Sequence, residues 1–162
     1  MSRIYISVGS NIEAEKNIRV AVSALQEEYG ELLLSSVYES EAVGFDGDNF
    51  LNMVVALDTE DDIHQVARTL REIEDKNDRV RTGPRFSKRT LDLDLLLYDD
   101  LVLNEDHLEI PRGEIVENAF VLWPLAELAP GVTHPLAKKT IKALWDEYPK
   151  SRQNIWQIPF LF

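Results

Sequence analysis

Two kinds of hydrophobic spacing follow one another along the first hundred residues, and their order limits the folds that the chain can adopt. Alternation and strand-forming composition predict strands over residues 4–8, 32–38, 50–58 and 91–98. Apolar residues at helical spacing predict helices over residues 14–28 and 63–77. The order is therefore βαββαβ, which favours an α+β, ferredoxin-like fold: an antiparallel sheet with helices on one face.

The remaining residues are expected to add to this unit rather than to form another. Helices are predicted over residues 120–128, before Pro130, and near residues 141–145. A length of 162 residues with 44% hydrophobic residues suits one core of ordinary size. The sequence shows no repeat, low-complexity tract or linker. We therefore expect one domain over residues 1–162, with C-terminal additions to the sheet.

The charge balance argues against partners with anionic surfaces. The chain carries 29 acidic and 17 basic residues, a formal net charge of −12, and so repels nucleic-acid backbones and anionic lipids over most of its exterior. It has no cysteine, which fits a reducing compartment, and shows neither a secretory signal nor the roughly 20 apolar residues that span a bilayer. We expect a cytoplasmic monomer that binds small molecules, without nucleic-acid or membrane partners.

Against this acidic background, one short segment is strongly basic. It holds Arg79, Arg81, Arg85, Lys88 and Arg89, with no intervening acid. Gly83 and Pro84 indicate a loop. Guanidinium groups clamp phosphate oxygens, so the segment is a candidate anion site. The alternative is a structural basic loop that pairs with acids elsewhere on the protein.

Two carboxylates follow this segment on the fourth predicted strand. Residues two apart on a strand share a side, so Asp92 and Asp94 project together. A cation relieves their repulsion, and Mg²⁺ commonly takes one or two carboxylates together with phosphate oxygens. The alternative is an edge strand with two solvated acids. Beside the basic segment, the pair indicates phosphoryl-group transfer from a nucleotide, although no Walker motif is present.

A polar residue interrupts the apolar strand over residues 50–58. Asn52 lies between Leu51 and Met53, and a buried amide of this kind needs hydrogen-bond partners. A flat heterocycle rich in donors and acceptors would supply them, with Phe50 and Phe120 as stacking partners. The alternative is that the backbone satisfies Asn52 and that the phenylalanines belong to the core.

These residues lie in motifs that resemble the 6-hydroxymethyl-7,8-dihydropterin pyrophosphokinase family over nearly the whole chain. The resembling pieces are Gly9-Ser10-Asn11, Tyr38 to Asn52, Arg79-Val80-Arg81, Arg89-Thr90-Leu91-Asp92-Leu93-Asp94-Leu95-Leu96 and Phe120-Val121-Leu122-Trp123-Pro124-Leu125. The resemblance implies a ferredoxin-like fold, with ATP as co-substrate and two Mg²⁺ ions. It also implies transfer of the β,γ-pyrophosphate to the pterin hydroxymethyl oxygen, with release of AMP, in folate biosynthesis.

The resemblance further implies roles for individual residues. Asp92 and Asp94 would bind the metal, and Arg79 and Arg89 would neutralise the transferred phosphates as catalytic residues. ATP contacts are implied for Glu74, Arg81, Arg85 and Arg112. Pterin contacts are implied for Ser40, Val43, Phe50, Asn52 and Phe120. Asn52 would bind the pterin edge, while the two phenylalanines would sandwich its ring.

Three places depart from the usual pattern of the family. Phe86-Ser87-Lys88 precedes Arg89 where the family usually has Trp-Gly-Pro, Pro111-Arg112 replaces Pro-His, and Asn118 replaces an arginine. Arg112 is expected either to take over a phosphate contact or to mark a drop in nucleotide affinity. Two alternatives stay open: a diverged paralogue acting on another pterin-like acceptor, and a non-catalytic ferredoxin-like ligand-binding module.

Overall fold

The order of elements along the chain follows the predicted alternation, in a computed structural model that describes residues 1–41, 48–78, 91–105 and 107–162. The strands are β1 (Ser2–Ser10), β2 (Leu33–Leu34), β3 (Val37–Ser40), β4 (Phe50–Thr59), β5 (Asp92–Tyr98), β6 (Leu103–Glu105), β7 (Leu108–Ile110) and β8 (Ile155–Ile158). The helices are α1 (Ala14–Tyr29), α2 (Ile63–Asp78), α3 (Glu114–Glu117), α4 (Ala119–Leu128), α5 (Ile141–Glu147) and the 3-10 helix η1 (Lys150–Arg152). The predicted α+β class is confirmed.

An antiparallel sheet joins segments from both ends of the chain. Its strand order is β5-β1-β4-β3-β8, with β2 also beside β4, and β6 and β7 form a separate two-stranded sheet. β1 pairs with β4 from Ser2 opposite Thr59 to Ser10 opposite Leu51, and its other edge pairs with β5. The long strands β1 and β4 thus form the centre, while β8, which was not predicted, covers the free edge of β3.

The strand predicted over residues 32–38 is two short strands, so this prediction is wrong in its continuity. Leu34 lies opposite Val55 and Tyr38 opposite Asn52, so β3 is out of step with β2 by one residue. Ser35 lies at this irregularity: its N–H donates to the Val54 carbonyl at 3.0 Å, and its Oγ accepts from the Val54 N–H at 2.9 Å. A side chain thus replaces one ladder bond, as happens where a bulge disrupts pairing.

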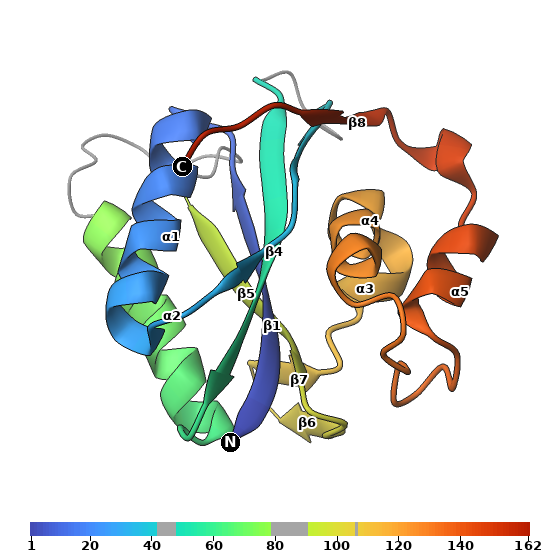
Figure 1. Ribbon diagram of the computed structural model, residues 1–162, viewed down its shortest axis with the longest axis horizontal. Helices are drawn as coiled ribbons and strands as arrows, with labels where there is room; N and C mark the ends of the chain where they lie inside the picture. Colours follow the sequence, from blue (N-terminus) through green and yellow to red (C-terminus); the bar gives the residue numbers. More distant parts are fainter. Residues whose placement is uncertain (42–47, 79–90, 106) are drawn as a thin grey trace.

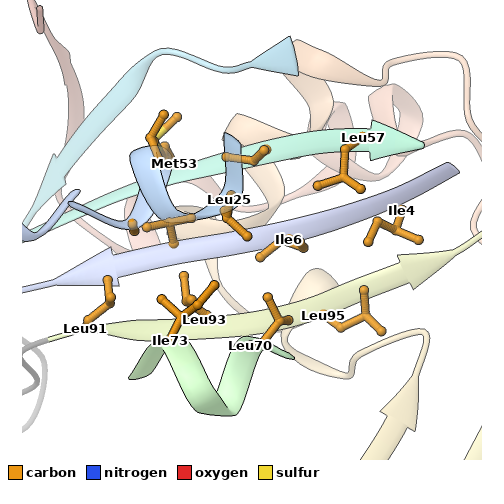
Figure 2. Packing of buried hydrophobic residues seen from close by; sticks show 14 of the residues in the cluster. Ile4, Ile6, Leu25, Met53, Leu57, Leu70, Ile73, Leu91, Leu93 and Leu95 are labelled. Atoms are coloured by element: carbon orange, nitrogen blue, oxygen red, sulfur yellow. The ribbon is translucent and has the colours of Figure 1, made fainter. Parts of the chain in front are cut away.

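Helices cover both faces of the sheet. α1 and α2 lie on one face, and α3, α4 and α5 lie on the other (Figure 1). On the first face, Leu25 of α1, Ile73 of α2 and Ile6 of β1 belong to one buried cluster (Figure 2). A second cluster on the other face includes Val54 of β4 and Leu122 of α4. The expectation of helices on one face therefore holds for α1 and α2, and the C-terminal additions supply a third layer.

The two long helices begin and end with local hydrogen bonds. Gly30 ends α1, with φ of 83° and its N–H donating to the Gln26 carbonyl at 2.9 Å. At the start of α2, Asp62 Oδ1 accepts from the Gln65 N–H at 2.9 Å, so Asp62 is the capping residue. The hydroxyl of Thr59, the last residue of β4, accepts from the Asp61 N–H at 3.0 Å. None of the helices described has the length and apolar character needed to cross a bilayer.

Candidate active site

A row of four residues crosses the sheet at one end. The register places Asp92 of β5 opposite Gly9 of β1, Gly9 opposite Asn52 of β4, and Asn52 opposite Tyr38 of β3. Directly opposed residues point to the same face, which is the face that α4 covers. In this cross-strand row, the Asp92 carboxylate and the Asn52 amide therefore share a face, on strands roughly 10 Å apart.

Gly9 makes room in the middle of the cross-strand row. A Cβ added at Gly9 would lie 2.5 Å from Asn52 Nδ2, well inside van der Waals contact. Gly9 lies inside β1, which extends to Ser10. Its role is thus steric: the missing side chain leaves space for the amide of Asn52.

Two buried polar groups at this end lack a hydrogen-bond partner within the described parts of the chain: Asn52 Oδ1 and Ser40 Oγ. The two residues are 5% and 1% exposed. Ser40 lies opposite Phe50, two positions from Asn52, so both groups are on the same face. A buried polar group without a partner costs about 1–3 kcal/mol. The arrangement suits a ligand that carries hydrogen-bonding groups along one edge.

Tyr38, at the end of the cross-strand row, is held by partners that sequence reasoning missed. Its hydroxyl donates to Glu127 Oε1 at 2.6 Å and accepts from Gln157 Nε2 at 3.0 Å. Burial raises the pKa of the Tyr38 hydroxyl, so it remains protonated. The ring lies 4.7 Å from that of Trp123. These contacts tie β3 to α4 and β8 and keep the strand beside Asn52 in place.

The two phenylalanines predicted to hold the pterin ring come from different elements. Phe50 begins β4 and shares a face with Asn52, and Phe120 lies in the first turn of α4. Both are half-buried, and Phe120 packs at the margin of the second core cluster. The fold thus places both rings on the side of the sheet that carries Asn52, while their role toward a ligand stays a prediction.

The acid pair is positioned by β5 and by a contact from α2. Asp92 and Asp94 lie opposite Gly9 and Ser7, and both are half-buried. Between them, the Leu93 N–H donates to Glu74 Oε2 at 2.8 Å. Glu74, predicted to contact ATP, therefore anchors the strand segment that carries both carboxylates. The sequence carried no sign of this bond, which depends on how α2 packs on β5.

Arg112 brings a positive charge to the acid pair. Its Nη2 lies 3.5 Å from Asp94 Oδ1, and its Nε donates to Glu114 Oε1 at 2.8 Å. Burial lowers the pKa of the Arg112 guanidinium, but the charges of Asp94 and Glu114 outweigh this effect and raise the pKa above its usual value. Glu74, Asp94 and Arg112 also line a cavity of about 110 Å³. The residue predicted for ATP thus lies beside the predicted metal ligands.

The donors at this end of the sheet fit a magnesium site completed by phosphate. Among the described residues, no group of three or more His, Cys, Asp or Glu side chains could hold a metal. Two carboxylates on one face of one strand are all-oxygen donors, and Mg²⁺ usually takes one or two carboxylates plus substrate phosphates. Asp92 and Asp94 therefore suit a cation that arrives with a nucleotide.

Five of the predicted site residues lie outside the described residues: Val43, Arg79, Arg81, Arg85 and Arg89. The roles implied for them stay predictions.

Comparison with known proteins decides the family. Residues 5–130 match the model of the 7,8-dihydro-6-hydroxymethylpterin-pyrophosphokinase (HPPK) family. The chain belongs to this pyrophosphokinase family. The resemblance found in the sequence motifs is thereby confirmed, and it extends over both the Asn52 strand and the Asp92–Asp94 strand.

Two bacterial relatives named as pyrophosphokinases align with this chain over most of their length. The 2-amino-4-hydroxy-6-hydroxymethyldihydropteridine pyrophosphokinase of Aquifex aeolicus is 32% identical over 147 residues, or 88% of this chain and 89% of that protein. The Pseudomonas aeruginosa protein of the same name is 37% identical over 139 residues, or 83% and 85%. A Plasmodium falciparum HPPK-DHPS structure with pterin and p-hydroxybenzoate superposes with a TM-score of 0.73 at 14% identity. The superposition covers 93% of this chain but only 43% of the Plasmodium falciparum chain, and it supports the fold alone.

Proposed function

We propose that this chain transfers pyrophosphate from ATP to the hydroxymethyl group of 6-hydroxymethyl-7,8-dihydropterin and releases AMP, as a step of folate biosynthesis. Membership of the family makes it an ATP-dependent diphosphotransferase. The observation that carries the proposal is the cross-strand row, in which the Asn52 amide and the Asp92 carboxylate share one face. One group suits the edge of a polar heterocycle, and the other suits a metal–phosphate complex.

Binding of the pterin, the substrate that accepts pyrophosphate, is assigned to the buried polar groups. Asn52 Oδ1 accepts from the pterin edge, and Ser40 Oγ adds a second hydrogen bond, because both are buried without a partner among the residues described. Phe50 and Phe120 enclose the ring, and Val43 lines the same pocket. Held this way, the pterin directs its hydroxymethyl oxygen along the row toward the carboxylates.

The donor side is assigned to the acid pair and the basic residues. Asp92 and Asp94 would hold the two Mg²⁺ ions of this proposal, and the metal would supply positive charge that neutralises the phosphates. Arg79 and Arg89 stabilise the transferred group, and Arg81, Arg85 and Arg112 bind other phosphate oxygens of ATP. Glu74 orients the carboxylates through its bond to the Leu93 N–H.

The reaction balances as an in-line displacement at the β-phosphorus. The hydroxymethyl oxygen forms a bond to Pβ while the bond from Pβ to the oxygen that it shares with Pα breaks. AMP leaves with that oxygen and the electron pair, and the hydroxyl proton is released. The protein's share of catalysis is positioning and charge neutralisation, because both reacting groups come from substrates.

We also propose that residues 1–162 form one cytoplasmic, monomeric domain. The sheet supports a single unit, because β8, near the C-terminus, pairs with β3, and Arg19 of α1 donates to the Leu161 carbonyl at 2.8 Å. The absence of cysteine fits a reducing compartment. Sedimentation of the purified chain tests the monomer, and a dimer would contradict it.

The experiment that tests the activity identifies the bond that breaks. The purified chain is incubated with ATP, Mg²⁺ and 6-hydroxymethyl-7,8-dihydropterin, and AMP is separated from ADP by chromatography. We expect AMP and pyrophosphorylated pterin in equal amounts, and no AMP with 6-methyl-7,8-dihydropterin, which lacks the accepting hydroxyl. ADP as the product, or no turnover by a folded protein, would contradict the proposal. Turnover only with another acceptor would indicate a diverged paralogue.

A further inference from the structure

Arg112 is held at several points beside the predicted metal ligands. Its backbone N–H donates to the Leu96 carbonyl at 3.0 Å, which fixes the residue against β5. Its Nε donates to Glu114 Oε1 at 2.8 Å, while Glu114 Oε2 accepts from Asn118 Nδ2 at 3.2 Å. Glu114 is thus oriented by two partners, and it directs the guanidinium toward β5.

The contact of Arg112 with Asp94 is looser than its contact with Glu114. Nη2 lies 3.5 Å from Asp94 Oδ1, which is an ion-pair distance beyond good hydrogen-bond geometry. The side chains are 35% and 33% exposed, so water partly screens the pair. The strong bond therefore holds the arginine in place, and the weak one can be exchanged without moving the backbone.

We propose that Arg112 is an internal counter-charge for Asp94, which a divalent cation must displace, and that the displaced guanidinium then binds the phosphates of the nucleotide. The inference rests on the proposed function, because it takes Asp94 as a metal ligand. Arg112 acts on the metal through Asp94 and is therefore a positioning residue for it. A cation at Asp94 and a guanidinium 3.5 Å away repel each other, so the two compete for one carboxylate.

This competition couples the two ligands of the enzyme. Without nucleotide, a cation that binds Asp94 leaves Arg112 facing another positive charge. With nucleotide, phosphate oxygens pair with Arg112 and also complete the coordination of the cation. Each ligand therefore raises the affinity for the other by the same factor. The device favours loading of the metal together with ATP over loading of the metal alone.

The test measures metal binding without turnover. Mn²⁺ serves as a paramagnetic substitute for Mg²⁺, and free Mn²⁺ is measured by electron paramagnetic resonance in titrations of the whole chain without nucleotide. We expect Arg112→Gln to bind Mn²⁺ about two- to fivefold more tightly than wild type, the range of a partly exposed ion pair. Arg112→Lys keeps the charge and should stay closer to wild type than Arg112→Gln.

The matched control removes an arginine from an ion pair at the other end of the sheet. Arg3 Nε lies 2.6 Å from Asp58 Oδ1, so Arg3→Gln makes the same change in net charge without touching the acid pair. It should leave Mn²⁺ affinity unchanged. Should Arg112→Gln fail to fold by circular dichroism, Arg112→Met, which keeps much of the apolar stem, takes its place.

The second half of the inference is tested with nucleotide present. In saturating Mg²⁺, Arg112→Gln should bind α,β-methylene-ATP, in which the reacting bridge is blocked, at least twofold more weakly by calorimetry. The factor by which this analogue tightens Mn²⁺ binding should also be smaller in the variant than in wild type. Unchanged affinity for the analogue would overturn the assignment of Arg112 to the phosphates.

The outcomes separate this inference from the proposed function. The counter-charge is overturned if Arg112→Gln binds Mn²⁺ no more tightly than wild type, or if Arg3→Gln shows the same gain in affinity. The metal assignment still stands in that case, provided that Asp94→Asn weakens Mn²⁺ binding. If Asp94→Asn leaves Mn²⁺ binding unchanged, the metal assignment in the proposed function fails, and the counter-charge fails with it.

Discussion

At the scale of single residues, the acid pair is expected to control turnover without controlling the fold. Asp92→Asn and Asp94→Asn keep the shape of the side chain but remove a charged metal ligand, so AMP formation should fall by about 100-fold or more. Both positions are half-buried, and thermal unfolding should remain cooperative. Asp58→Asn removes a carboxylate at the other end of the sheet and should keep turnover within twofold. Near-normal activity of either site variant would refute the metal assignment.

The glycine of the cross-strand row is expected to control pterin binding through Asn52. In Gly9→Ala, the new methyl group would lie 2.5 Å from Asn52 Nδ2, so the amide must move. The loss of one or two hydrogen bonds, each about 1 kcal/mol, should weaken pterin binding about five- to thirtyfold in a fluorescence titration. Affinity for α,β-methylene-ATP should change little, because the Asn52 amide is assigned to the pterin and not to ATP.

A second glycine provides the matched control for this substitution. A Cβ at Gly131 would have no heavy atom within 4 Å, so Gly131→Ala should leave pterin affinity unchanged. Equal pterin affinity in Gly9→Ala and Gly131→Ala would show that Asn52 does not depend on the space at Gly9.

At the scale of elements, the stability of α2 should depend on its capping aspartate. Asp62→Ala removes the acceptor for the Gln65 N–H, and the loss of such a cap costs about 1 kcal/mol of unfolding free energy. The difference is measured by urea denaturation, with Glu60→Ala as a control that removes a like charge from the same turn. A loss in Glu60→Ala as large as that in Asp62→Ala would mean that charge, not the cap, is responsible.

The elements also show which signals in the sequence are sufficient. α1 and α2 were predicted because each carries a long apolar stripe that packs on one face of the sheet. The break between β2 and β3 was missed because it depends on Ser35 bonding to Val54, nineteen positions away. β8 was missed because four residues at a sheet edge contain too few periods to stand out, and its partner is β3.

At the scale of the whole molecule, the site was predictable in its parts but not in its connections. Asp92, Asp94 and Asn52 stood out because polar side chains interrupted apolar strands. The space at Gly9 depends on the register of β1 against β4, and the hydrogen bond from Tyr38 to Glu127 spans 89 positions. Arg112 stood out only as a departure from the family pattern, and its contact with Asp94 required the fold. Register and packing, which arise from the whole chain, decide these connections.

The stability of the whole molecule at acidic pH should depend measurably on one buried histidine. His134 is 5% exposed, and its Nδ1 accepts from the N–H groups of Leu136 and Ala137 at 3.1 and 3.0 Å. Burial lowers the pKa of the His134 imidazole in the folded state. As pH falls below about 6.5, the unfolded chain therefore takes up a proton that the folded chain resists, and stability is lost.

The size and direction of this effect can be measured where few other groups titrate. From pH 7.5 to pH 5.5, the unfolding free energy of the wild type should fall, at a limiting slope of about 1.4 kcal/mol per pH unit for one proton. In His134→Asn, the amide oxygen can accept the same two N–H groups without titrating, so the fall should be smaller. Asp58 and Asp146 have lowered pKa values, so their contribution to the unfolding free energy is lost only at more acidic pH. Parallel curves for the two proteins in urea denaturation would show that His134 is not the group responsible.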